Sequence, residues 1–234
     1  MSDPRRLLIF DLDGTLIDSQ RDLANSVNAA RDHLGLGPLA DHLIYSYVGN
    51  GAPALIRRAL GPEAPQTEVD KALEFFLRFY HEHMLEHTRL YPGVQEALDR
   101  LLEAGHSLAV LTNKPWRISE AIVEGLGLTG HFQRVYGGNS FAEKKPHPIG
   151  IDTLVTELDW SRQSTIMVGD SAVDIRTARN AGVMACGVTY GFQPETLKSD
   201  PPDLLIDNMI ELADYVLSPA VAAAAAAASV FPSR

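Results

Sequence analysis

Two patterns of apolar residues divide this chain. The apolar run that begins at Leu8 is short and uninterrupted, which is typical of a strand buried on both faces of a parallel sheet. From residue 18 to about residue 90, apolar residues recur at helical spacing instead, as in the stripe Leu23, Val27 and Ala30. We therefore expect one strand followed by a compact helical region.

After residues 91–93 (Tyr-Pro-Gly), short apolar runs alternate with segments of helical periodicity, which indicates a parallel α/β sheet. The predicted helices span about 94–104, 118–126, 148–158 and 172–181, and the predicted strands span 107–111, 133–136, 165–168, 184–188 and 204–206. These elements predict an α/β fold with a doubly wound parallel sheet, a Rossmann-like core with an inserted helical domain.

The helical region interrupts the core directly after its first strand. We predict an α/β catalytic core from residues 1–17 and 90–217 and a helical cap from residues 18–89. Its position in the chain puts the cap over the carboxyl end of the first strand, where it can close and exclude water. The low-complexity tail, 218–234 with an alanine tract at 220–228, is expected to carry no function.

Two carboxylates follow the first strand. Asp11 and Asp13 are two residues apart, so on an extended chain both address one volume at the carboxyl edge of the sheet, where open α/β sheets bind ligands. Two carboxylates at such close range repel each other, so the site favours a cation, a shared proton or both. Taken alone, the pattern is equally typical of a strand followed by an Asp-Gly turn.

Polar residues also follow later strands. Thr112 and Asn113 follow the second predicted strand of the core, Asp170 follows the fourth, and Lys145 lies in a loop between them. In a doubly wound sheet these positions converge beside the two aspartates. Asp174 follows Asp170 by about one helical turn and faces the same side. Each residue alone is more typical of a helix cap or a solvated loop, but together they indicate a site.

The candidate metal ligands favour a hard cation. Carboxylate oxygens suit Mg²⁺, which binds through one or two carboxylates, keeps several waters and accepts phosphate oxygens. His81, His83 and His87 are predicted on one helix, where the last two have ligand spacing, but no third ligand is evident nearby. An exposed helix face is therefore the simpler interpretation of these histidines.

Length and charge narrow the possible functions. The 234 residues, 45% of them hydrophobic, can bury a sizeable core, and a formal net charge of −10 argues against binding nucleic acid or an anionic membrane. No apolar run suggests a membrane span and no signal-peptide pattern opens the chain, so we expect a cytoplasmic protein. Cys186 is expected to be buried. The sequence does not decide between a monomer and a homodimer.

Four motifs together resemble those of the haloacid dehalogenase superfamily and span nearly the whole chain in the expected order. They are 11–15 (Asp-Leu-Asp-Gly-Thr), Thr112-Asn113, Lys145-Pro146, and 169–171 (Gly-Asp-Ser) with Asp174. Within the superfamily, the stretches 47–51, 91–94, 112–115, 144–148 and 187–191 look most similar to the phosphoglycolate phosphatases.

The resemblance implies a Mg²⁺-dependent phosphatase that hydrolyses a small phosphate monoester through an aspartyl-phosphate intermediate. The best candidate substrate is 2-phosphoglycolate, cleaved to glycolate and phosphate. By analogy with the family motifs, Asp11 would be the nucleophile and Asp13 the general acid and base. Thr112, Asn113 and Lys145 would bind the substrate, with Thr112 and Lys145 on the phosphoryl oxygens.

The same resemblance implies the metal site. The Asp11 carboxylate, the Asp13 backbone carbonyl and Asp170 would hold Mg²⁺, and Asp174 would orient Lys145 or a metal-bound water. Because these elements contact only phosphate and metal, the cap would set specificity. Cap candidates for substrate binding are Asn50, Arg57 and Arg58, although the two arginines are equally typical of a solvated helix face.

Other functions compete with this one. A phosphomutase of the β-phosphoglucomutase kind would use the same core with a cap that excludes water, and another small sugar phosphate is a possible substrate. A phospho-acceptor of the response-regulator kind is much shorter and lacks a helical insert. A dehalogenase would need no metal, so Asp13 and Asp170 argue against it.

Overall fold

A six-stranded parallel sheet forms the core of the protein. The structure is a computed structural model and describes residues 5–218. The strands lie in the order β5-β4-β1-β6-β7-β8, and every neighbouring pair is parallel. They are β1 (Leu7–Phe10), β4 (Ser107–Leu111), β5 (Arg134–Tyr136), β6 (Thr165–Gly169), β7 (Met184–Val188) and β8 (Leu204–Ile206). The predicted fold class is confirmed, and β1 is central.

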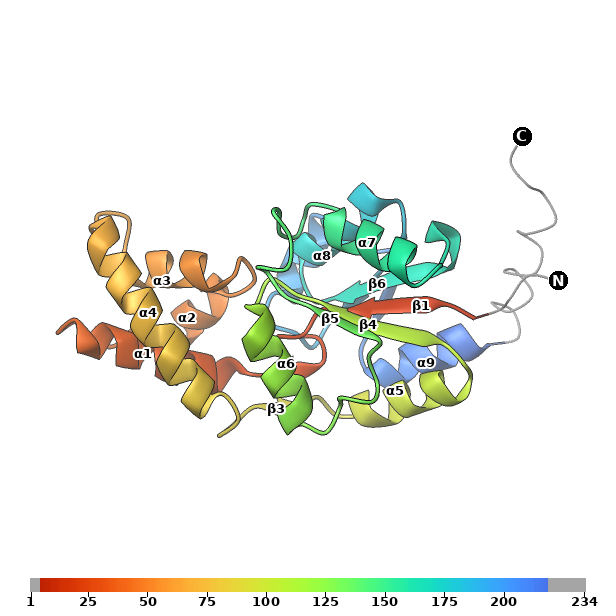
Figure 1. The fold of residues 1–234 in the computed structure, drawn as a ribbon, viewed down its shortest axis with the longest axis horizontal. Helices are drawn as coiled ribbons and strands as arrows, with labels where there is room; N and C mark the ends of the chain where they lie inside the picture. The colour runs from red at the N-terminus through yellow and green to blue at the C-terminus, as the bar shows by residue number, and fades with distance from the viewer. Residues whose placement is uncertain (1–4, 219–234) are drawn as a thin grey trace.

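Helices cover both faces of this sheet (Figure 1). They are α5 (Val94–Glu103), α6 (Trp116–Gly125), α7 (Ile149–Glu157), α8 (Ala172–Ala181) and α9 (Met209–Leu217). Leu7 and Ile9 of β1 pack in the apolar cluster that includes residues of α7 and α8. Leu8 and Phe10 pack in the cluster on the opposite face, with residues of α5, α6 and α9. Both faces of β1 are therefore buried, as its uninterrupted apolar run predicts.

Four further helices form a separate bundle beyond the end toward which β1 points (Figure 1). They are α1 (Gln20–His33), α2 (Asp41–Tyr47), α3 (Ala52–Leu60) and α4 (Gln66–His83). The apolar stripes of α1 and α4 face each other, so Leu23, Val27, Phe76 and Tyr80 are buried together. We call residues 18–89 the cap, and it lies over the carboxyl edge of the sheet.

Two very short strands connect the cap to the core. β2 (Ile17–Asp18) and β3 (Arg89–Leu90) pair antiparallel, with Ile17 opposite Leu90 and Asp18 opposite Arg89. The sequence did not predict either strand, because two residues are too few to show an alternating pattern.

A buried carboxylate fastens the two connections together. Asp22, at the start of α1, accepts hydrogen bonds from the backbone N–H groups of His87 (2.9 Å) and Thr88 (2.8 Å). It also accepts from the Thr88 hydroxyl at 2.8 Å and lies 2.8 Å from Nδ1 of His87. The expectation that His87 lies on a helix with His83 is wrong, because α4 ends at His83 and His87 turns back toward Asp22.

The structure differs from the prediction in two further helices. Helix α9 was not predicted, and α6 begins at Trp116, two residues before the expected start.

None of the helices within residues 5–218 combines the length and hydropathy that a membrane crossing requires. The alanine tract at 220–228 lies outside the described residues.

Candidate active site

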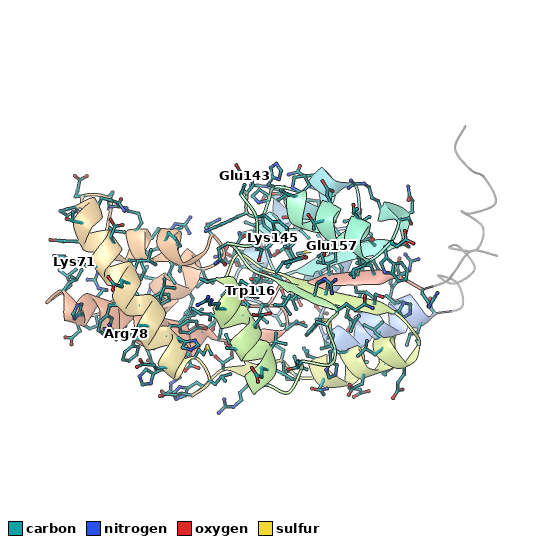
Figure 2. The ribbon with its side chains drawn as sticks, viewed as in Figure 1. Lys71, Arg78, Trp116, Glu143, Lys145 and Glu157 are labelled. Atoms are coloured by element: carbon teal, nitrogen blue, oxygen red, sulfur yellow. The ribbon has the colours of Figure 1, made fainter. Side chains whose placement is uncertain are left out.

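The ends of three neighbouring strands bring the predicted site residues together. Asp11 follows β1, Thr112 follows β4 and Asp170 follows β6, and β1 lies between the other two strands. These three residues line one pocket between the sheet and the cap. Lys145 comes from the loop before α7 and lies at the end of the sheet that faces the cap (Figure 2). The predicted convergence at the carboxyl edge is therefore observed.

Three buried carboxylates lie close together, and one lysine pairs with two of them. Asp11, Asp170 and Asp174 each place an oxygen within 4.8 Å of the others. The ammonium group of Lys145 lies 2.9 Å from Oδ1 of Asp11 and 2.6 Å from Oδ1 of Asp174. Asp174 is further held by Ser171, whose hydroxyl donates to its Oδ2 at 2.8 Å. The cluster therefore contains three acidic groups and one cation, all buried.

The pKa values in the cluster reflect this crowding. Burial raises the pKa of Asp11 to about 6, and the Asp174 carboxylate adds to the rise although Lys145 opposes it. Burial and the neighbouring carboxylates of Asp174 and Asp11 raise the pKa of Asp170 well above its ordinary value. Burial alone would lower the pKa of Lys145, but Asp11 and Asp174 outweigh it and raise that pKa. The pocket holds an excess of negative charge that a cation would relieve.

A hard divalent cation fits these donors. Oδ1 of Asp11 is buried and accepts no well-oriented hydrogen bond, although Lys145 is close to it. Oxygen donors from carboxylates at this separation suit Mg²⁺ better than a softer metal. Asp174 fits less well as a ligand, because Lys145 and Ser171 already occupy both of its oxygens. Asp11 and Asp170 are therefore the side chains best placed to hold the ion.

Backbone contacts fix the orientation of Asp170. Its Oδ2 accepts hydrogen bonds from the backbone N–H of Phe192 at 2.6 Å and of Gln193 at 3.2 Å. Gly14 has a φ of +79°, and a Cβ at Gly14 or Gly191 would collide with the Asp170 side chain. Glycine is therefore required where the backbone approaches this carboxylate.

Asp13 lines the same pocket, but its carboxylate has other partners. Lys114 donates to its two oxygens at 2.8 and 2.9 Å, and the hydroxyl of Ser19 donates to Oδ1 at 2.5 Å. Lys114 also donates to the hydroxyl of Tyr80, a cap residue, at 2.7 Å. Burial lowers the pKa of Lys114, but the Asp13 carboxylate and Tyr80 outweigh it and raise that pKa. Lys114 is therefore a buried cation bound by core and cap together.

The sequence did not single out Lys114 or Tyr80. Lys114 directly follows the Thr112-Asn113 motif, so adjacency to that motif was the available signal. Tyr80 belongs to the apolar stripe of α4, so its periodicity indicates only burial.

Other predicted residues have structural partners. The Asn113 amide donates to the carbonyls of Gly49 (3.0 Å) and Lys145 (3.1 Å), and its Oδ1 accepts from the Lys145 N–H at 3.0 Å. Asn50 is not among the residues that line the pocket, and its Oδ1 accepts from Arg58 at 2.7 Å. Arg57 donates to the carbonyl of Ala64 at 2.6 Å. The structure thus brings neither Arg57 nor Arg58 into the described pocket.

The chain is similar to known proteins over most of its length. The model of the haloacid dehalogenase-like hydrolase family matches residues 8–188. A phosphoglycolate phosphatase from Chromobacterium violaceum is 41% identical over 217 residues, covering 90% of this chain and 96% of that protein. One from Vibrio vulnificus is 40% identical over 221 residues, covering 91% and 96%. A crystal structure described as a predicted phosphoglycolate phosphatase from Haemophilus somnus has a TM-score of 0.85 and 34% identity, covering 92% of this chain and 97% of that one.

Proposed function

This chain belongs to the haloacid dehalogenase-like hydrolases and is similar over most of its length to phosphoric monoester hydrolases, and from this premise we propose that it hydrolyses 2-phosphoglycolate to glycolate and inorganic phosphate. The observation that carries the proposal is the meeting of Asp11, Lys145 and Asp170 at the carboxyl edge of the sheet, beneath the cap. We propose that the substrate is a small soluble ester and that the reaction takes place in the cytoplasm.

Asp11 is the nucleophile. Its carboxylate oxygen attacks phosphorus and the bond from phosphorus to the glycolate oxygen breaks, which leaves an aspartyl-phosphate and glycolate. Water then attacks that phosphorus, releases inorganic phosphate and restores the Asp11 carboxylate. Two displacements replace one direct attack of water, and each has a lower barrier.

Asp13 moves the protons. In the first displacement its carboxylic acid protonates the departing glycolate oxygen, and in the second its carboxylate accepts a proton from the attacking water. Ser19 and Lys114 hold this carboxyl group in one orientation through three hydrogen bonds. A fixed acid close to the leaving oxygen removes the need for solvent to supply the proton.

Positive charge and hydrogen bonds receive the phosphoryl group. Lys145 is fixed by Asp174 and neutralises charge on the phosphoryl oxygens, and the hydroxyl of Thr112 donates to one of them. Asp11 and Asp170, with the backbone carbonyl of Asp13, would hold Mg²⁺. Bound there, the ion would lower the repulsion between the anionic ester and the carboxylates.

The test is a panel of phosphate esters assayed with Mg²⁺ for release of inorganic phosphate. We expect kcat/KM for 2-phosphoglycolate to exceed that for sugar phosphates by at least about tenfold, with no requirement for a bisphosphate activator. A higher value for a sugar phosphate would refute the substrate while leaving the phosphatase proposal intact. A requirement for a bisphosphate would instead indicate a phosphomutase. Asp11→Asn is the control for contaminating phosphatases.

A further inference from the structure

The pocket holds few groups able to recognise a substrate carboxylate. Among the described residues that line it, Lys114 carries the only cationic side chain. On the cap side, Tyr80 supplies the only polar side chain, because the other lining residues of the cap are apolar or glycine. Arg57 and Arg58 of the cap donate to other partners, as described above.

The remaining polar side chains of the pocket already have partners. Asn113 donates to Gly49 and Lys145, and the Ser171 hydroxyl donates to Asp174. The Gln193 amide donates to the carbonyl of Val48 at 2.8 Å. Thr112 serves the phosphoryl group in the proposed mechanism. Lys114 also has partners, Asp13 and Tyr80, but it carries the only positive charge among the described residues that line the pocket, and the Tyr80 hydroxyl proton has no acceptor within the described part of the chain. Lys114 and Tyr80 are therefore the donors best suited to any other anionic part of the substrate.

We propose that Lys114 and Tyr80 form the subsite that binds the carboxylate of 2-phosphoglycolate and so determine specificity. This inference rests on the proposed function. The two donor atoms, Nζ of Lys114 and the Tyr80 oxygen, are 2.7 Å apart, so they can serve the two oxygens of one carboxylate. Because the Tyr80 oxygen accepts from Lys114, its own proton remains available for donation.

The position of the subsite follows from the chemistry of the substrate. Asp13 must contact the oxygen that leaves phosphorus, and in 2-phosphoglycolate a single methylene separates that oxygen from the carboxylate carbon. Lys114 lies 2.8 Å from the Asp13 carboxylate, so a substrate whose leaving oxygen contacts Asp13 has its carboxylate beside Lys114. A longer substrate would place its acidic group elsewhere in the pocket.

Lys114 can turn toward the substrate without leaving Asp13 unpaired. Oδ1 of Asp13 accepts from both Ser19 and Lys114, so the Ser19 bond remains when Lys114 redirects one proton. A buried ammonium group also gains from a second anion nearby, because little water screens the pair.

The experiment compares 2-phosphoglycolate with 2-hydroxyethyl phosphate, which has the same length but no carboxylate. We expect Lys114→Gln to lower the ratio of their kcat/KM values by about 100-fold, since the ester without a carboxylate is affected only through the loss of the contact between Lys114 and Asp13. Tyr80→Phe keeps the ring and is expected to lower the same ratio about fivefold. Lys144→Gln removes an exposed cation near Gly51 at the same edge and should leave the ratio unchanged.

Each outcome decides the inference. Equal losses for both esters in Lys114→Gln would overturn it, because Lys114 would then act only through Asp13. If Lys114→Gln does not fold, an unchanged ratio in Tyr80→Phe overturns it. A wild-type enzyme that is selective for 2-phosphoglycolate, with variants that keep the selectivity, refutes the subsite alone. A wild-type enzyme with no preference for the carboxylate ester refutes the proposed substrate as well.

Discussion

Replacing Asp22 with alanine should destabilise the protein strongly, although the residue lies outside the pocket. Its carboxylate is buried and accepts hydrogen bonds from His87 and Thr88, which lie 65 and 66 positions away in the sequence. These bonds tie the start of α1 to the segment that returns from the cap to the core.

The magnitude follows from the donors that lose their acceptor. Thr88 is fully buried, so in Asp22→Ala its N–H and hydroxyl groups have no replacement partner, at about 1–3 kcal/mol each. His87 is partly exposed and its donors can turn to water. We expect a loss of about 3–5 kcal/mol in the free energy of unfolding, a large share of the roughly 5–15 kcal/mol typical of a domain. Asp22→Asn keeps one acceptor and should lose about 1–2 kcal/mol.

Urea unfolding at several pH values measures both the size and the cause. Burial raises the pKa of Asp22, but the hydrogen bonds from His87 and Thr88 outweigh it and hold the pKa below the ordinary value of 3.8. The stabilisation is therefore fully present above the unfolded-state pKa and is lost as the pH falls through the folded-state pKa. The difference in unfolding free energy between wild type and Asp22→Asn should be constant from about pH 7 to about pH 5 and shrink below about pH 4.

Two results would contradict this reasoning. A loss below about 1 kcal/mol in Asp22→Ala would mean that water reaches the freed donors. A difference between wild type and Asp22→Asn that stays constant to about pH 3 would mean that the ionised carboxylate is not the stabilising form. Asp32→Ala removes an exposed carboxylate from the same helix and should change stability by no more than about 0.5 kcal/mol.

Three further predictions concern the pocket. Asp11→Asn should lower kcat by at least about 10⁴-fold and abolish inhibition by beryllium fluoride, and phosphate-release assays that retain a substantial rate would reject Asp11 as the nucleophile. Chelation of divalent cations should abolish turnover, and Asp170→Asn should raise the Mg²⁺ concentration needed for half-maximal rate by at least about tenfold, measured by Mg²⁺ titration. Gly14→Ala places a Cβ at a φ of +79° against Asp170, so we expect the free energy of unfolding, measured by thermal unfolding, to fall by about 2 kcal/mol. An unchanged Tm would show that the loop relaxes.

The sequence predicted the fold where the pattern was long enough to show a period. The central strand and the alternating elements after residue 93 follow from apolar runs and helical stripes, and all the predicted strands after that point occur in the sheet. Helix α9 was missed although Met209, Leu212, Ala213 and Val216 have helical spacing and Asn208 caps the helix, so its signal was present.

The residues of the site also differ in how well the sequence could predict them. Asp11, Thr112 and Asp170 could be found because each follows a strand, and the carboxyl ends of parallel strands lie at one edge. The cap residues that line the pocket could not be predicted, because helical periodicity does not indicate which face of a helical bundle contacts the sheet. The predicted candidate Asn50 accepts a hydrogen bond from Arg58 and does not line the described pocket, whereas Tyr80, which does line it, has the sequence signature of a core residue.

The paired strands β2 and β3 have a consequence for the evolution and engineering of this enzyme. Because the chain leaves the core and returns to it side by side, residues 19–88 can be exchanged for the equivalent segment of a relative without breaking the six-stranded sheet. Asp22, His87 and Thr88 all lie within the exchanged segment, so the donor segment must supply its own equivalent of these contacts. Lys114 stays behind while Tyr80 leaves, so a chimera needs a donor segment that brings its own hydroxyl to that lysine.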